Sequence, residues 1–259
     1  MSDLPPLQEA SLRDKVAVVT GAAQGIGRAT ALRLAAEGAL VTCADIKDTR
    51  ETVALAEKEG GQAVGVELDV RVAADWEAGI ADVLERHGRV DLLANVAGIV
   101  NMQSEDTVVG LTEEAWDNVL ATDLKGVWLG MRAVIPSMIE NGGGRIVNIS
   151  SLAALRGLPN LASYSAAKGG VIGLTQQAAF EYGPRNVLVN AIAPGTIDTP
   201  ILGDITPEMK AANARAHIID RLGLPEEIAS MVAYLFREGR FVTGQVYPVD
   251  GGWSAKGNY

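Results

Sequence analysis

The chain has 259 residues, of which 48% are hydrophobic and 21% are charged, and its formal net charge is −10. This composition is typical of a soluble globular protein, and the acidic balance disfavours nucleic acid as a partner because phosphate binding needs a basic surface. The longest stretch without a charged side chain, residues 92–104, is too short to span a bilayer. The first residues lack the basic and apolar regions of a signal peptide, so we expect a cytoplasmic protein.

Short apolar runs alternate with longer amphipathic segments along the chain. Strands are expected at 15–20, 39–45, 62–69, 90–98, 145–151, 186–195 and 245–252. Helices are expected from a glycine-rich turn to about residue 37, and over about 49–59, 72–87, 112–139, 163–182 and 225–239. This alternation predicts one α/β domain over residues 1–259, a doubly wound parallel sheet with helices on both faces. We expect a flexible segment over about 1–12 and a substrate lid over about 196–224.

The sequence "TGAAQGIG" (20–27) lies directly between the first strand and the first helix. Gly21 permits a tight turn, and Gly25 and Gly27 remove side chains where the backbone must approach a diphosphate. The following helix presents free N–H groups and a positive dipole end to the anion. This turn therefore predicts a dinucleotide site.

Asp45 ends the second strand and can accept both ribose hydroxyls of an adenosine, whereas it would repel a 2′-phosphate. No Arg or Lys occupies the turn at 22–24, where a basic side chain could bind a 2′-phosphate. Lys47 lies nearby and is the one residue that favours NADP. We therefore expect NAD rather than NADP. The single cysteine, Cys43, excludes an intrachain disulfide, and the histidines show no ligand spacing, so no metal site is expected.

Tyr164 and Lys168 in "YSAAK" stand four residues apart and share one helix face. A neighbouring ammonium favours the phenolate, and this tuning suits a general acid/base. Ser151, at the end of the fifth strand, can hold a substrate oxygen beside the phenol. Proton transfer by Tyr164 with hydride transfer at a nicotinamide would interconvert a secondary alcohol and a ketone.

The chain resembles the short-chain dehydrogenase/reductase family from about residue 12 to residue 252. The matching motifs are "TGAAQGIG", Asp69, "NVAG" (95–98), "NISS" (148–151), "YSAAK", "NAIAPGTIDT" (190–199) and "VDGG" (249–252). The resemblance implies strand order 3-2-1-4-5-6-7, and a homotetramer, or a homodimer, built through the two long central helices. It also implies that Ser151 orients the substrate, that Tyr164 is the acid/base, and that Lys168 binds the nicotinamide ribose. The expected cofactor contacts are Gly21, Gln24, Gly25, Ile26, Gly27, Asp45, Ile46, Asp69, Val70, Asn95, Ala97, Gly98, Tyr164, Lys168, Pro194, Gly195, Ile197 and Thr199.

One position departs from the family pattern, because Asp123 stands where the family usually has an Asn of the catalytic tetrad. The family's Asn holds a water in a proton relay through its backbone carbonyl and braces a neighbouring strand with its side chain. An ionised Asp has no donor, whereas an Asn amide has two, so the side-chain role is the one affected. A buried Asp that is protonated instead would recover one donor. We expect the relay and the activity to be retained, and Asp123 is kept among the catalytic residues.

The substrate pocket is expected between residues 99–104, 152–161 and 196–220, whose apolar side chains favour a small or alicyclic, hydrophobic hydroxy compound over a sugar. An alternative is a 3-oxoacyl carrier-protein reductase, although that activity usually requires NADPH and a basic patch. A non-catalytic NAD-binding regulator is a further alternative. The C-terminal "WSAKGNY" (253–259) could fold over a neighbouring subunit's pocket.

Overall fold

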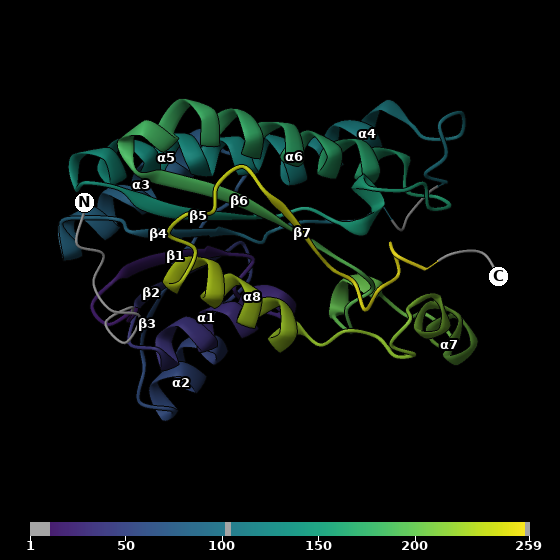
Figure 1. The fold of residues 1–259 in the computed structure, drawn as a ribbon, viewed down its shortest axis with the longest axis horizontal. Helices are drawn as coiled ribbons and strands as arrows, with labels where there is room; N and C mark the ends of the chain where they lie inside the picture. Colours follow the sequence, from purple (N-terminus) through teal and green to yellow (C-terminus); the bar gives the residue numbers. More distant parts are fainter. Residues whose placement is uncertain (1–10, 102–104, 257–259) are drawn as a thin grey trace.

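A computed structural model describes residues 11–101 and 105–256. Seven parallel strands form one sheet in the order β3-β2-β1-β4-β5-β6-β7 (Figure 1). They are β1 (Val16–Thr20), β2 (Leu40–Asp45), β3 (Gln62–Glu67), β4 (Leu92–Asn95), β5 (Gly144–Ile149), β6 (Val187–Pro194) and β7 (Val246–Val249). The expected strand order is confirmed, and the parallel register brings all strand carboxyl ends to the same edge.

Helices cover both faces of this sheet (Figure 1). One layer contains α1 (Gly25–Ala36), α2 (Arg50–Lys58) and α8 (Pro225–Arg237). The other contains α3 (Ala73–His87), α4 (Glu113–Leu120), α5 (Gly126–Glu140) and α6 (Ala162–Tyr182). The sheet is therefore doubly wound, as predicted.

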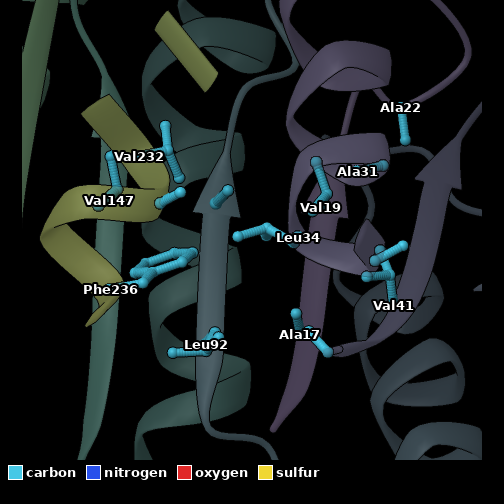
Figure 2. Packing of buried hydrophobic residues seen from close by; sticks show 14 of the residues in the cluster. Ala17, Val19, Ala22, Ala31, Leu34, Val41, Leu92, Val147, Val232 and Phe236 are labelled. Atoms are coloured by element: carbon cyan, nitrogen blue, oxygen red, sulfur yellow. The ribbon is translucent and has the colours of Figure 1, made fainter. Parts of the chain in front are cut away.

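Two hydrophobic cores fill the spaces between the sheet and its helical layers. In one of them, Leu34 from α1 and Phe236 from α8 meet apolar side chains of the central strands (Figure 2). Trp76 of α3 is fully buried in the other core. Complete burial of one large apolar side chain contributes roughly 1.5–3 kcal/mol to the free energy of unfolding. The two cores therefore hold the strand ends in place.

The structure differs from the sequence-based expectation in two segments. The expected helix over 112–139 is interrupted by a π-helical turn, Ala121–Lys125, between α4 and α5. The stretch 196–224, where a substrate lid but no helix is expected, contains the helix α7 (Pro207–Ala216), which stands apart from both layers (Figure 1). Thr206 caps α7 by accepting a hydrogen bond from the Met209 N–H, and Pro207 occupies its first turn.

Within the part of the chain that the structure describes, no helix is long and apolar enough to cross a membrane. Across the same residues, no group of three or more His, Cys, Asp or Glu side chains could hold a metal ion. The proposed flexible segment, apart from its last two residues, lies outside the described residues, as do positions 102–104 of one expected pocket wall and 257–259 of the C-terminal tail.

Candidate active site

The glycine turn connects β1 to α1 in a conformation that side chains would obstruct. Gly21 and Gly25 have φ angles of 67° and 55°, a region that favours glycine. A methyl group on Gly27 would lie 2.0 Å from the carbonyl oxygen of Gly21, so this glycine allows the helix to pack against the turn itself. The first N–H groups of α1 are therefore held next to the turn, as an anion site requires.

Asp45 at the end of β2 is fixed by backbone donors. Its Oδ2 accepts from the Ala23 N–H at 3.0 Å, and its Oδ1 accepts from the Lys47 N–H at 2.9 Å. The Lys47 ammonium is 3.4 Å from the Gln24 side-chain oxygen. The carboxylate is consequently held at one end of the glycine turn, in the position expected for an adenosine ribose ligand.

A cavity of about 490 Å³ lies at the carboxyl edge of the sheet, above the glycine turn. The lining of this cavity fits a dinucleotide. Gly21, Gly25 and the N-terminus of α1 suit its diphosphate, and the acidic Asp45 suits its adenosine ribose. Most of the expected cofactor contacts line this cavity: Gly21, Gln24, Gly25, Ile26, Gly27, Asp45, Ile46, Asp69, Val70, Ala97, Gly98 and Thr199.

Other expected contacts lie outside the lining of this cavity. Asn95 is buried, and its side-chain amide donates to Asn148 Oδ1 at 2.8 Å. Pro194 ends β6, and a methyl group on Gly195 would lie 2.7 Å from the His217 Nε2. Ile197 is buried in a core cluster. Among the described residues, these four therefore shape the edge of the sheet without facing this cavity.

Tyr164, Lys168 and Ser151 come together at the start of α6. Ser151 caps the short 3₁₀ helix Leu152–Ala154 after β5, where its side chain accepts from the Ala153 N–H, and it lowers the pKa of Tyr164. The Lys168 ammonium is 5.5 Å from the centre of the Tyr164 ring and donates to the Ile149 carbonyl at 3.0 Å. Lys168 is buried, whereas Tyr164 is partly exposed. The expected catalytic residues thus form one cluster.

Asp123 joins this cluster from the π-helical turn between α4 and α5. Its Oδ2 lies 3.0 Å from the Lys168 Nζ, and its Oδ1 accepts from the Ile99 N–H at 2.9 Å. Gly98 lines the cavity directly beside this pair, since a methyl group there would lie 2.7 Å from the Asp123 Oδ2. The pair therefore connects the catalytic cluster to the cofactor cavity, and Asp123 also braces the segment after β4.

Burial and charge act together on the ionisable groups of the cluster. Burial raises the pKa of Tyr164 above its ordinary value and Asp123 raises it further, whereas Lys168 and Ser151 lower it. Burial lowers the pKa of Lys168, but Asp123 and Tyr164 outweigh this and raise it. Burial also raises the pKa of Asp123, against the opposing effects of Lys168 and the Ile99 N–H. The Oδ1 atom of Asp123 accepts from the Ile99 N–H, and its Oδ2 makes the ion-pair contact with the Lys168 ammonium.

Sequence reasoning missed a second group of residues, which ties the segment around α7 to the rest of the fold. His217 at the end of α7 is buried, and its Nε2 accepts from the Thr196 N–H at 3.2 Å. The Trp253 ring meets the His217 ring edge-on, with centroids 5.0 Å apart. Trp253 also accepts, through its carbonyl, a hydrogen bond of 3.0 Å from Arg156. These contacts join 196–224 to 152–161 through the C-terminal segment. The Thr-Pro-Glu sequence at the start of α7 indicates the helix but not these contacts.

The order of the sheet, the glycine turn and the cavity above it define a Rossmann-type dinucleotide-binding protein. Residues 21–254 match a family profile described as Enoyl-(Acyl carrier protein) reductase. The short-chain reductase protein NovJ of Streptomyces niveus is 41% identical over 93% of this chain and 94% of its own length. The 3-oxoacyl-[acyl-carrier-protein] reductase FabG of Thermotoga maritima is 40% identical over 93% and 98%.

Two further comparisons agree with these. The cyclohexanol dehydrogenase of an Acinetobacter species is 38% identical over 94% of this chain and 96% of its own length. The crystal structure of gox2181 superposes with a TM-score of 0.91, at 32% identity, over 96% of this chain and 99% of that one. The chain belongs to the short-chain dehydrogenase/reductase family, and it is an oxidoreductase that uses a nicotinamide cofactor.

Proposed function

We propose that the protein is an NAD-dependent oxidoreductase that interconverts a secondary alcohol and a ketone. The observation that carries this proposal is the buried Lys168 ammonium, 5.5 Å from the centre of the Tyr164 ring. Such a phenol can move a proton to or from a substrate oxygen. A bound nicotinamide dinucleotide supplies the two-electron acceptor or donor.

Each residue of the cluster has a distinct task in the proposed reaction. Tyr164 takes the hydroxyl proton when an alcohol is oxidised and returns it when a ketone is reduced. Ser151 holds the substrate oxygen next to the phenol. Lys168 stabilises the phenolate, and one of its three N–H groups can bind the nicotinamide ribose while others reach Asp123 and Ile149. Asp123 positions Lys168.

We propose NAD rather than NADP because of the acidic end of the cavity. The two backbone bonds to Asp45 hold its carboxylate in place, so a 2′-phosphate would meet a fixed negative charge. Lys47 compensates this negative charge only in part, because its ammonium is directed to the side chain of Gln24. The expected ribose contacts at Asp45 and Ile46 support the same choice.

We propose a small or alicyclic, hydrophobic hydroxy compound as the substrate. Leu155, Ile201 and Met209 on the expected pocket walls are apolar and more than one third exposed, which suits an apolar ligand better than a sugar. The cyclohexanol dehydrogenase among the relatives acts, by its name, on an alicyclic alcohol. Residues 196–224, including α7, would form the lid over this substrate.

A 3-oxoacyl carrier-protein reductase is the second candidate, because the Thermotoga maritima relative carries that name. The net charge of −10 opposes docking of an acidic carrier protein, and Asp45 opposes NADPH. A non-catalytic regulator is the less favoured alternative, since the tyrosine, the lysine and the serine are all present and in contact.

We also propose that residues 1–259 form one domain that assembles as a homotetramer or homodimer. Trp128 on α5 is 43% exposed and Phe180 on α6 is 82% exposed, so both central helices carry apolar side chains on their outer surfaces. Burial of such side chains between copies would stabilise an assembly. Sedimentation velocity distinguishes these assemblies from a monomer.

The proposed function is tested by following NADH absorbance at 340 nm with NAD and NADP against cyclic and open-chain secondary alcohols. A thioester of an acyl-carrier protein with NADPH tests the second candidate. Tyr164→Phe keeps the ring and removes the proton, so turnover should fall by about 10²–10⁴-fold while NAD binding is nearly unchanged. An active Tyr164→Phe enzyme would contradict the role of this phenol.

A further inference from the structure

The ion pair between Asp123 and Lys168 is shielded from solvent on all sides. The exposed fractions of the two side chains are 0% and 3%, and their charged atoms lie 3.0 Å apart. Asp123 is fixed from its other oxygen by the Ile99 N–H, and Lys168 is fixed by the Ile149 carbonyl. Neither side chain can turn toward water, so the two charges remain together.

A paired lysine acts differently on Tyr164 from an unpaired one. The ammonium stabilises a phenolate because it carries a positive charge close to the ring. A carboxylate at 3.0 Å from the ammonium makes the net charge of the pair zero. With an amide in place of the carboxylate, the same site would carry a net charge of +1, and it would favour the phenolate more strongly.

We propose that Asp123 is a positioning residue that cancels the charge of Lys168 and thereby moves the working range of the acid/base to more alkaline pH. This inference rests on the proposed role of Tyr164. The free enzyme then holds the phenolate, the form that accepts a proton from an alcohol, only at more alkaline pH.

The other groups around the phenol do not account for this effect. Lys168 is one turn along α6, Ser151 approaches from the segment after β5, and Asp123 approaches from the π-helical turn. Asp106 lies near the start of α6, where its carboxylate accepts from the N–H and the hydroxyl of Ser163. Asp106 is present both in the wild type and in a variant at position 123. A difference between these two proteins therefore reports the exchange at position 123 and not the charge of Asp106.

Ultraviolet titration of tyrosinate on the full-length, cofactor-free protein tests the inference without any substrate. The chain has five tyrosines, so the signal of Tyr164 is obtained by subtracting the Tyr164→Phe spectrum in each background. Asp123→Asn keeps an oxygen for the Ile99 N–H and removes the charge, while its NH2 group replaces the oxygen that faces Lys168. We expect Tyr164 in Asp123→Asn to ionise at a pH lower by about one unit or more than in the wild type.

The pH dependence of kcat/KM for alcohol oxidation gives a second readout, since it reports the free enzyme. The rising limb of this pH profile should move to lower pH in Asp123→Asn by a similar amount. Asp123→Ser is a second variant that removes the charge. An unchanged or higher titration in a folded variant would overturn the inference.

The wild type alone also tests it, because a phenolate already present near neutral pH would overturn it whatever the variants do. If the titration shifts as expected but no alcohol or ketone is turned over with either cofactor, the proposed function fails and the charge cancellation stands. If alcohols are oxidised but the titration does not shift, the proposed function stands and this inference fails.

Discussion

Gly27→Ala should disrupt the cofactor site through the backbone of the turn. The added methyl would lie 2.0 Å from the Gly21 carbonyl oxygen and 2.5 Å from its carbon, against ordinary contacts of 3.4 Å or more. Both obstructing atoms belong to the backbone, so the turn must move by at least about 1 Å. Overpacking of this kind costs about 1–3 kcal/mol, and a misplacement of 1 Å can cost about 100-fold in function.

We therefore expect the dissociation constant of NADH to rise by about tenfold or more in Gly27→Ala, which corresponds to about 1.4 kcal/mol. Fluorescence enhancement of NADH on titration with enzyme measures this constant, and a thermal melt measures the stability. Gly173→Ala in α6 is the matched control, because among the described residues nothing beyond its own helix and chain neighbours lies within 4 Å of its added methyl.

In Gly173→Ala, affinity should be unchanged and stability equal or slightly higher, since alanine is the better helix former. If Gly27→Ala bound NADH as tightly as the wild type with an unchanged melting temperature, the close contact between α1 and the turn would not control the site.

Two further substitutions test the adenosine end of the cavity and the attachment of the segment around α7. Asp45→Ser removes the fixed carboxylate near Lys47, so the ratio of kcat/KM for NADP to that for NAD should rise by about tenfold or more; a ratio that stays constant in steady-state assays would contradict the ribose assignment. Trp253→Ala removes the ring that packs on His217, so KM for the alcohol should rise several-fold while the affinity for NADH is kept. An unchanged KM would show that Trp253 does not hold the proposed lid, residues 196–224.

Much of the fold was predictable because buried strands and amphipathic helices leave strong local patterns. The sheet order required the family resemblance, since periodicity alone does not order parallel strands. Helix α7 was missed because it contains no buried residue, so no apolar stripe marks it. Its capping sequence, Thr206-Pro207-Glu208, was nevertheless readable as a helix start.

Site residues were predicted best where a motif fixes the backbone. The glycine turn and Asp45 line the cavity as expected, because their positions follow directly from the ends of β1 and β2. Asn95 lies only two positions from Ala97, yet its side chain is buried against Asn148 while Ala97 lines the cavity. Here the chain leaves regular strand structure after Asn95, and strand alternation could not tell which neighbours face the cavity.

The π-helical turn around Asp123 could not be predicted, because the apolar pattern of 112–139 runs through it without a break. Sequence comparison alone presents the exchange of Asn for Asp as the loss of an amide donor. In the structure the exchange also places a buried carboxyl group 3.0 Å from the Lys168 ammonium, which we propose acts on Tyr164. A buried charge without a partner would be strongly destabilising, so Asp123 is tolerated because Lys168 already lies beside it. The same contact makes the two residues one neutral unit, and the acidity of Tyr164 then depends on both of them.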